Sequence, residues 1–146
     1  MEDIPHDLVN GLNQPVLRHI RELSAHGDVA EALIQSVKPL GDVQTFCPDV
    51  SQYRYVVVST RQVIFGFAIG INQIGFRLDA RMKDRALATG GMAFPVCGDD
   101  WVCFGPFQDD WPKVDLEFWA RKAYGFARET ENVQQSGPAS GAPRPR

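Results

Sequence analysis

The chain has 146 residues, 44% of them hydrophobic and 23% charged, and a formal net charge of −3 at pH 7. This length suits a single domain with one modest core, and the acidic balance argues against a global attraction to nucleic acid or anionic lipid. The N-terminal stretch "MEDIPHDLVNGLNQP" lacks the pattern of a signal peptide, and the apolar run "VIFGFAIGI" has about half the length of a membrane span. Together with an odd number of cysteines, these features predict a soluble cytoplasmic protein.

Two helices are predicted in the N-terminal part of the chain. The first begins near Asn13, carries apolar residues at helical spacing and ends at Gly27. The second has Asp28 as its N-cap, in a capping-box pattern with Glu31, and ends before Pro39. The link between them is short, so the two helices can form one bent unit.

Residues 53–78 show the pattern of extended chain. The segments "YRYVVVS" and "VIFGFAIG" are rich in β-branched and aromatic residues, and only Thr60, Arg61 and Gln62 separate them. A link of that length requires antiparallel strands. A further turn at "INQ" leads into "IGFRL", so we expect a three-stranded meander.

The stretch "ALATGGMAFPVCGDDWVCF" ends a helix and begins a hairpin. Asp79 is the expected cap of a helix over residues 80–89, which Gly90 and Gly91 follow. Phosphate-binding loops place glycines before a helix, whereas these glycines lie at the carbonyl end, so they are a C-terminal cap. "MAFPVC" and "WVCFG" are expected strands with Asp99 and Asp100 in the turn between them.

The last predicted helix begins near Asp115 and is followed by a polar, Pro/Gly-rich segment without periodicity. We therefore divide the chain into an N-terminal arm (1–12), one domain (13–131) and a disordered tail (132–146). Apolar side chains that recur at helical spacing should form the buried stripe of this helix. They are Leu116, Trp119, Ala120, Ala123 and Ala127.

The order of these elements predicts an α+β fold. It is a two-layer arrangement, α-β(3)-α-β(2)-α, with a twisted antiparallel five-stranded sheet and helices on one face.

Part of the chain resembles a known family. The motifs are "FGFAIGINQIGFRLD", then "GGMAFP", a hairpin with Trp101, and a closing helix "DLEFWARKAYGFAR". This order is similar to the N-terminal domain of the competence regulator TfoX and to the YjbR-like proteins, over about Val56 to Arg128. The resemblance implies the fold of the type III secretion chaperones and a regulatory or binding module without a known catalytic residue.

Residues that could carry chemistry are scattered. His19 and His26 lie about 10 Å apart along a helix, too far to share a zinc ion. Cys97 and Cys103 would lie on opposite faces of a hairpin with a two-residue loop, and opposite each other with a three-residue loop; buried free thiols are the favoured interpretation. No serine lies in a nucleophile elbow, and no cysteine or serine has a nearby histidine. We predict no catalytic residue, no metal and no cofactor.

Alternation along the expected strands predicts a small-residue face. Val63, Phe65, Phe67 and Ile69 would point to the helices, which leaves Gly66 on the other side, and the same reasoning places Gly75 and Arg77 there. We call Gly66, Gly75 and Arg77 the small-residue face. A smooth surface of this kind suits close approach by a second copy or a partner's backbone. The alternative is that the glycines only relieve twist or mark bulges.

These features favour a small non-catalytic binding or regulatory domain that acts through protein–protein contact and self-associates as a homodimer. One alternative is a DNA-associated transcription or competence-type regulator, although the helix after Gly27 has few cations and "RMKDR" is typical of a solvated helix face. A second alternative is an enzyme with an unrecognised site.

Overall fold

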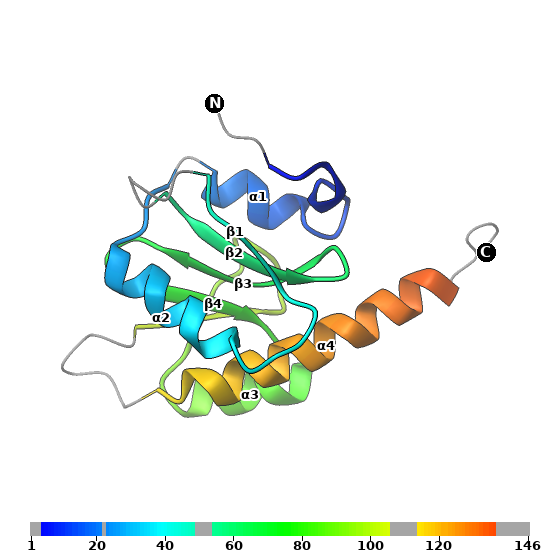
Figure 1. Cartoon of the computed structure of the whole chain (residues 1–146). Coiled ribbons are helices and arrows are strands. Elements are labelled where there is room, and N and C mark those ends of the chain that lie inside the picture. The colour runs from blue at the N-terminus through cyan, green and yellow to red at the C-terminus, as the bar shows by residue number, and fades with distance from the viewer. Residues whose placement is uncertain (1–3, 22, 49–53, 106–113, 137–146) are drawn as a thin grey trace.

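The computed structural model describes residues 4–21, 23–48, 54–105 and 114–136, and Figure 1 shows a curved sheet with helices on both sides. The predicted α+β class is confirmed: the sheet is antiparallel, in the order β1-β2-β3-β4-β6-β5. The elements in chain order are η1 (His6–Leu8), α1 (Gln14–Ile20), α2 (Gly27–Val37), β1 (Gln44–Phe46), β2 (Val56–Thr60), β3 (Val63–Ile69), β4 (Gln73–Arg77), α3 (Ala80–Ala88), β5 (Met92–Ala93), β6 (Trp101–Phe104) and α4 (Leu116–Ser136).

Two details of the predicted architecture are wrong. The sheet has six strands rather than five, because the short segment Gln44–Phe46 pairs with β2 at the sheet edge. Three half-exposed residues have too little periodicity to predict a strand. Helices also cover both faces: α2, α3 and α4 lie on one side of the sheet and α1 on the other (Figure 1). The strands β2 and β3 are buried along their whole length for this reason.

The first two helices do not form one bent unit. α1 ends at Ile20 rather than at Gly27, and the chain then passes an end of the sheet, where Ser24 forms a bridge with Arg54 and Ala25 with Gly70. The residues after Ile20 have helical spacing in the sequence but adopt an extended conformation. Their backbone pairs with the sheet at Ser24 and Ala25, and these bridges take the place of helical hydrogen bonds.

The cap of α2 also differs from the prediction. Nδ1 of His26 accepts a hydrogen bond from the backbone N–H of Asp28 at 3.1 Å, so His26 is the N-cap and Asp28 lies inside the first turn. There the carboxylate of Asp28 is close to the positive end of the helix dipole.

Other local predictions are confirmed. The side chain of Asp79 accepts from the N–H of Met82 at 2.8 Å and caps α3. At the other end of α3, the N–H of Gly91 donates to the carbonyl of Ala86 at 2.8 Å, so the glycine pair is a C-terminal cap. In α4, the expected stripe is buried at Trp119, Ala120, Ala123 and Ala127 and partly buried at Leu116.

A β-bulge reverses the side-chain alternation in β3. Val58 pairs with Gly66 while Ser59 pairs with Ile64, so Phe65 has no partner across the ladder. As a result, Phe65 packs in the core under α2 and α4, whereas Phe67, two residues later, packs in the core under α1. The prediction that these two rings share a face is therefore wrong.

The hairpin before α4 is shorter than predicted. β5 contains only Met92 and Ala93, and the chain from Phe94 to Asp100 forms turns instead of a strand. The last helix runs on to Ser136, into the segment that the sequence assigned to the tail. Residues 137–146 lie outside the described part of the chain, and the disordered tail stays a prediction for them.

Candidate functional site

The small-residue face predicted from the sequence is not an exposed surface. Gly66 and Gly75 are both buried, and they do not even lie on the same face of the sheet. A Cβ at Gly66 would lie 2.9 Å from Cγ2 of Val58 in the core under α2 and α4, and one at Gly75 would lie 2.3 Å from the ring of Phe67 on the α1 side. The glycines therefore make room for neighbouring side chains of the same chain, and a second copy finds no smooth face here.

Arg77 is also enclosed by the protein. Its side chain is about 10% exposed and its Nη2 lies 3.4 Å from a carboxylate oxygen of Asp100. The guanidinium lies over the ring of Phe126 on α4, at 4.5 Å from the ring centre. Burial lowers the pKa of Arg77, and the nearby Asp100 carboxylate opposes that shift. The prediction of an accessible arginine is wrong, because Asp100, expected only to form a turn, supplies the carboxylate.

A groove between α3 and α4 gathers cationic side chains. It has a volume of about 450 Å³ and is lined by residues of both helices. We call it the cationic groove. Its cations are Arg81 and Arg85 on α3 and Arg121 and Lys122 on α4, and its other lining residues are Asp79, Met82, Gly125, Phe126 and Glu129.

The four cations of this groove are exposed and make no ion pair with any carboxylate of the described residues. Two of them contact an aromatic ring: Arg85 and Lys122 lie over the ring of Phe118, at 5.6 and 5.4 Å from its centre. The whole chain has 15 basic and 18 acidic residues, and the groove itself has four cations against two carboxylates (Asp79 and Glu129), so it is a local excess of positive charge on an acidic protein.

The sequence contains this cluster in two separate pieces. "RMKDR" is typical of a solvated helix face, and Arg121 and Lys122 lie beside the buried stripe of the last helix, so neither piece indicates a binding site when it is considered alone. Only the packing of α3 beside α4 places the two sets of cations around one groove, and nothing in either piece indicates the other as a neighbour.

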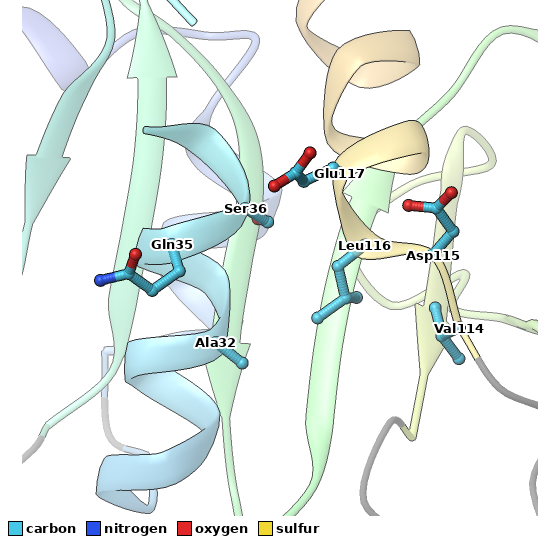
Figure 2. A pocket seen from close by; sticks show the side chains of 7 residues that line it. All are labelled: Ala32, Gln35, Ser36, Val114, Asp115, Leu116 and Glu117. Carbon is cyan, nitrogen blue, oxygen red and sulfur yellow. The ribbon is translucent and has the colours of Figure 1, made fainter. Parts of the chain in front are cut away.

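A second cleft separates α2 from the beginning of α4 (Figure 2). It encloses about 650 Å³, and Figure 2 shows Ala32 and Leu116 facing each other across it, with Glu117 at the rim. Two of the polar side chains here make local hydrogen bonds: the hydroxyl of Ser36 donates to the carbonyl of Leu33 at 2.7 Å, and Asp115 accepts from the N–H of Phe118 at 3.1 Å.

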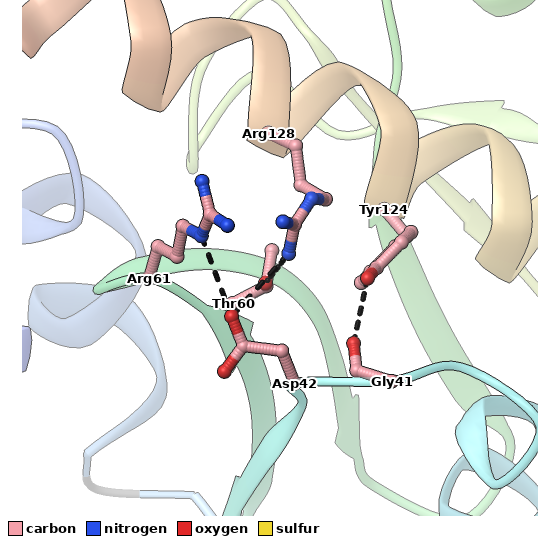
Figure 3. Close-up of polar contacts among 6 residues, drawn as sticks. All are labelled: Gly41, Asp42, Thr60, Arg61, Tyr124 and Arg128. Atoms are coloured by element: carbon pink, nitrogen blue, oxygen red, sulfur yellow. Dashed lines mark hydrogen bonds and ion pairs between the residues drawn. The ribbon is translucent and has the colours of Figure 1, made fainter.

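A polar cluster at the opposite end of the helix layer has a structural role (Figure 3). The carboxylate of Asp42 lies 3.4 Å from both Arg61 and Arg128. Hydrogen bonds from Gln44 and then from these two arginines lower its pKa. The Tyr124 hydroxyl donates to the carbonyl of Gly41 at 2.6 Å, which also ties α4 to the chain before β1. These contacts hold the loop in place, with Asp42 at a φ of 60°.

The cysteines agree with the expectation of free, buried thiols at two positions. Cys97 and Cys103 are free and buried in the core under α1, and Cys47 is free and partly buried. Burial raises the pKa of Cys97 to about 12 and raises that of Cys103 further. Neither predicted hairpin geometry applies to them, because β5 ends at Ala93, before Cys97.

Two kinds of feature are absent from the described residues. No group of three or more His, Cys, Asp or Glu side chains in that part of the chain is placed to hold a metal ion. Within the same residues, no helix is both long and apolar enough to cross a membrane.

Comparison with known proteins finds no matching family model, no similar curated protein and no similar solved structure. The resemblance to the TfoX N-terminal domain and the YjbR-like proteins therefore stays a prediction.

Proposed function

We propose that the protein is a non-catalytic binding domain that recognises an anionic partner at the cationic groove. One observation carries the proposal: four cations from two helices surround one concavity, and none has a carboxylate partner among the described residues. Cations of a structural role are normally paired within the fold, as Arg77 and Arg128 are here. Charges that face one open groove without a partner increase the local concentration of anions and speed their association.

Titration with poly-L-glutamate, followed by ¹H–¹⁵N NMR, tests the proposal. We expect the chemical shift changes to concentrate in α3 and in the first half of α4, and to weaken as salt is added. Replacing Arg81 and Arg85 together by glutamate should remove them. Lys38→Glu is the matched control, because Lys38 is an exposed cation at the end of α2, outside the groove.

The proposal is contradicted if the chemical shift changes are spread evenly over all exposed cations. It is also contradicted if the double variant shows the same chemical shift changes as the original protein. Self-association and a cytoplasmic location stay predictions from the sequence, as does an enzyme with an unrecognised site. Sedimentation at several protein concentrations measures self-association directly.

A further inference from the structure

We infer that the occupant of the cationic groove is an acidic segment of a partner protein that carries a large apolar side chain among its carboxylates. This inference rests on the proposed function and names the partner of the same site. It depends on three features of the groove: an apolar floor, cations on both walls, and two carboxylates that disfavour a continuous phosphate backbone.

Two partly buried apolar side chains, Met82 and Phe126, lie among the charged residues of the groove, and we call them its floor. The guanidinium of Arg77 already lies over the Phe126 ring, and the free space is next to it, at Gly125. An ideal Cβ at Gly125 would meet no atom within 4 Å, so the surface of α4 is open there. A ligand can place an aromatic or aliphatic side chain on this floor and so remove apolar surface from water. A ligand with only charged side chains leaves that apolar surface exposed to water.

Cations stand on both sides of that floor. Arg81 and Arg85 are one helical turn apart on α3, which places their side chains on one face about 6 Å apart at Cβ. Arg121 and Lys122 belong to the other wall. Guanidinium groups form two parallel hydrogen bonds to a carboxylate, so a segment with acidic residues on either side of its apolar anchor satisfies both walls.

Two acidic residues in the same groove argue against nucleic acid. Asp79 and Glu129 line it together with the cations. The phosphates of a nucleic acid are spaced regularly, about every 3.4 Å per strand along the axis of a DNA duplex, so a backbone laid along the groove would bring negative charge to Asp79 and Glu129 as well as to the cations. The acidic residues of a peptide can be spaced to meet the cations only. The net charge of −3 adds a general repulsion of polyanions.

Fluorescence anisotropy with the full chain and three labelled probes tests the inference. The probes are an acidic peptide with a central phenylalanine, the same peptide with alanine at that place, and an oligothymidylate of equal net charge. We expect the phenylalanine peptide to bind about tenfold more tightly than the alanine peptide, as burial of an aromatic ring implies. The oligothymidylate should bind more weakly than either peptide.

Two variants separate the floor from the walls. Gly125→Leu should abolish the advantage of the phenylalanine peptide by filling the floor, and it should not impair folding, because the position is open and leucine favours a helix over glycine. Arg81→Glu combined with Arg85→Glu should abolish binding of all probes, and Lys38→Glu should leave it unchanged.

The possible failures have different meanings. If the oligothymidylate binds most tightly, or if both peptides bind equally and Gly125→Leu has no effect, the inference is overturned while the anion-binding function stands. If no probe binds, or if binding survives the double charge reversal, the inference and the proposed function both fail.

Discussion

Replacing Asn13 by alanine should destabilise the fold by about 3–5 kcal/mol, although Asn13 does not line the cationic groove. The side chain is 1% exposed and joins three segments of backbone. Its Nδ2 donates to the carbonyls of Leu8 and Gln62, at 2.9 and 2.8 Å. Its Oδ1 accepts from the N–H of Ile64 at 3.0 Å. One amide therefore fastens the N-terminal segment to the turn between β2 and β3.

The size of this destabilisation depends on which hydrogen bonds the three partners of Asn13 still make after the substitution. The Leu8 and Gln62 carbonyls retain a second donor, because the backbone and the side chain of Asn10 bond to them at 3.1 and 3.0 Å. Each of these losses is worth about 1 kcal/mol. The buried N–H of Ile64 loses its side-chain acceptor, which costs about 1–3 kcal/mol in desolvation that is no longer compensated.

Urea unfolding followed by circular dichroism measures the difference. Asn10→Ala is the matched control. It removes the same amide from a more exposed position, where the side chain donates to Asp7 and Gln62 and accepts from the N–H of Asn13, and we expect a smaller loss of about 1–2 kcal/mol. If Asn13→Ala costs no more than Asn10→Ala, the reasoning from buried hydrogen bonds is refuted.

Asn13→Asp tests the direction in which the stability of the variant changes with pH. Burial beside the Leu8 and Gln62 carbonyls should raise the folded-state pKa of the new carboxyl above its unfolded value. The variant should therefore be least stable at neutral pH and recover as the pH falls through that pKa. A variant whose deficit is the same at pH 4 and pH 7 would show that the carboxyl reaches solvent.

Three further predictions concern single sites. Gly75→Ala should lower the free energy of unfolding by about 1–3 kcal/mol, because the new Cβ would lie 2.3 Å from the Phe67 ring; an unchanged urea midpoint would contradict this packing. Burial raises the pKa of Cys97 to about 12, so iodoacetamide should modify Cys47 faster in the native protein, and equal rates by peptide mass spectrometry would contradict it. The pKa of Asp42 is lowered by its hydrogen bonds, so its contribution to stability is present above its unfolded pKa and is lost as the pH falls through the folded value. Asp42→Asn should therefore weaken the acid dependence of the urea midpoint, and an identical pH profile would disprove the assignment.

The features that the sequence predicted correctly depend on neighbours within one or two turns of chain. The Asp79 cap, the glycine cap after α3 and the buried stripe of α4 are all of this kind. Their hydrogen bonds and periodicities lie within one element, so the local pattern is sufficient to specify them. The antiparallel meander is also local, because its links are too short for any crossover.

Errors arose where a distant segment changed the local preference. The first helix begins directly after Asn13, as predicted, but the Asn13 side chain bonds to Gln62 and Ile64 instead of capping the helix. The helical spacing up to Leu23 lost to backbone pairing of Ser24 with the sheet. In each case, a hydrogen bond to a remote part of the chain replaced one that was possible nearby.

The bulge at Phe65 had the largest consequence for function. Successive side chains of a strand point to alternate faces of the sheet. One extra residue therefore moves every later side chain of β3 to the other face. Phe67 consequently covers Gly75, and the supposed binding face became part of the core. The bulge depends on how β2 and β3 align, and composition does not indicate it.

The sequence by itself determined the types of most elements, their caps and the α+β class, because these follow from short-range hydrogen bonding and hydrophobic periodicity. Only the tertiary structure decided which faces are covered and which charges gather. Arg85 and Lys122 are far apart in the chain, yet both lie over Phe118. Electrostatic fields and grooves depend on distances in space, and those distances exist only after α3 and α4 have packed on the same sheet.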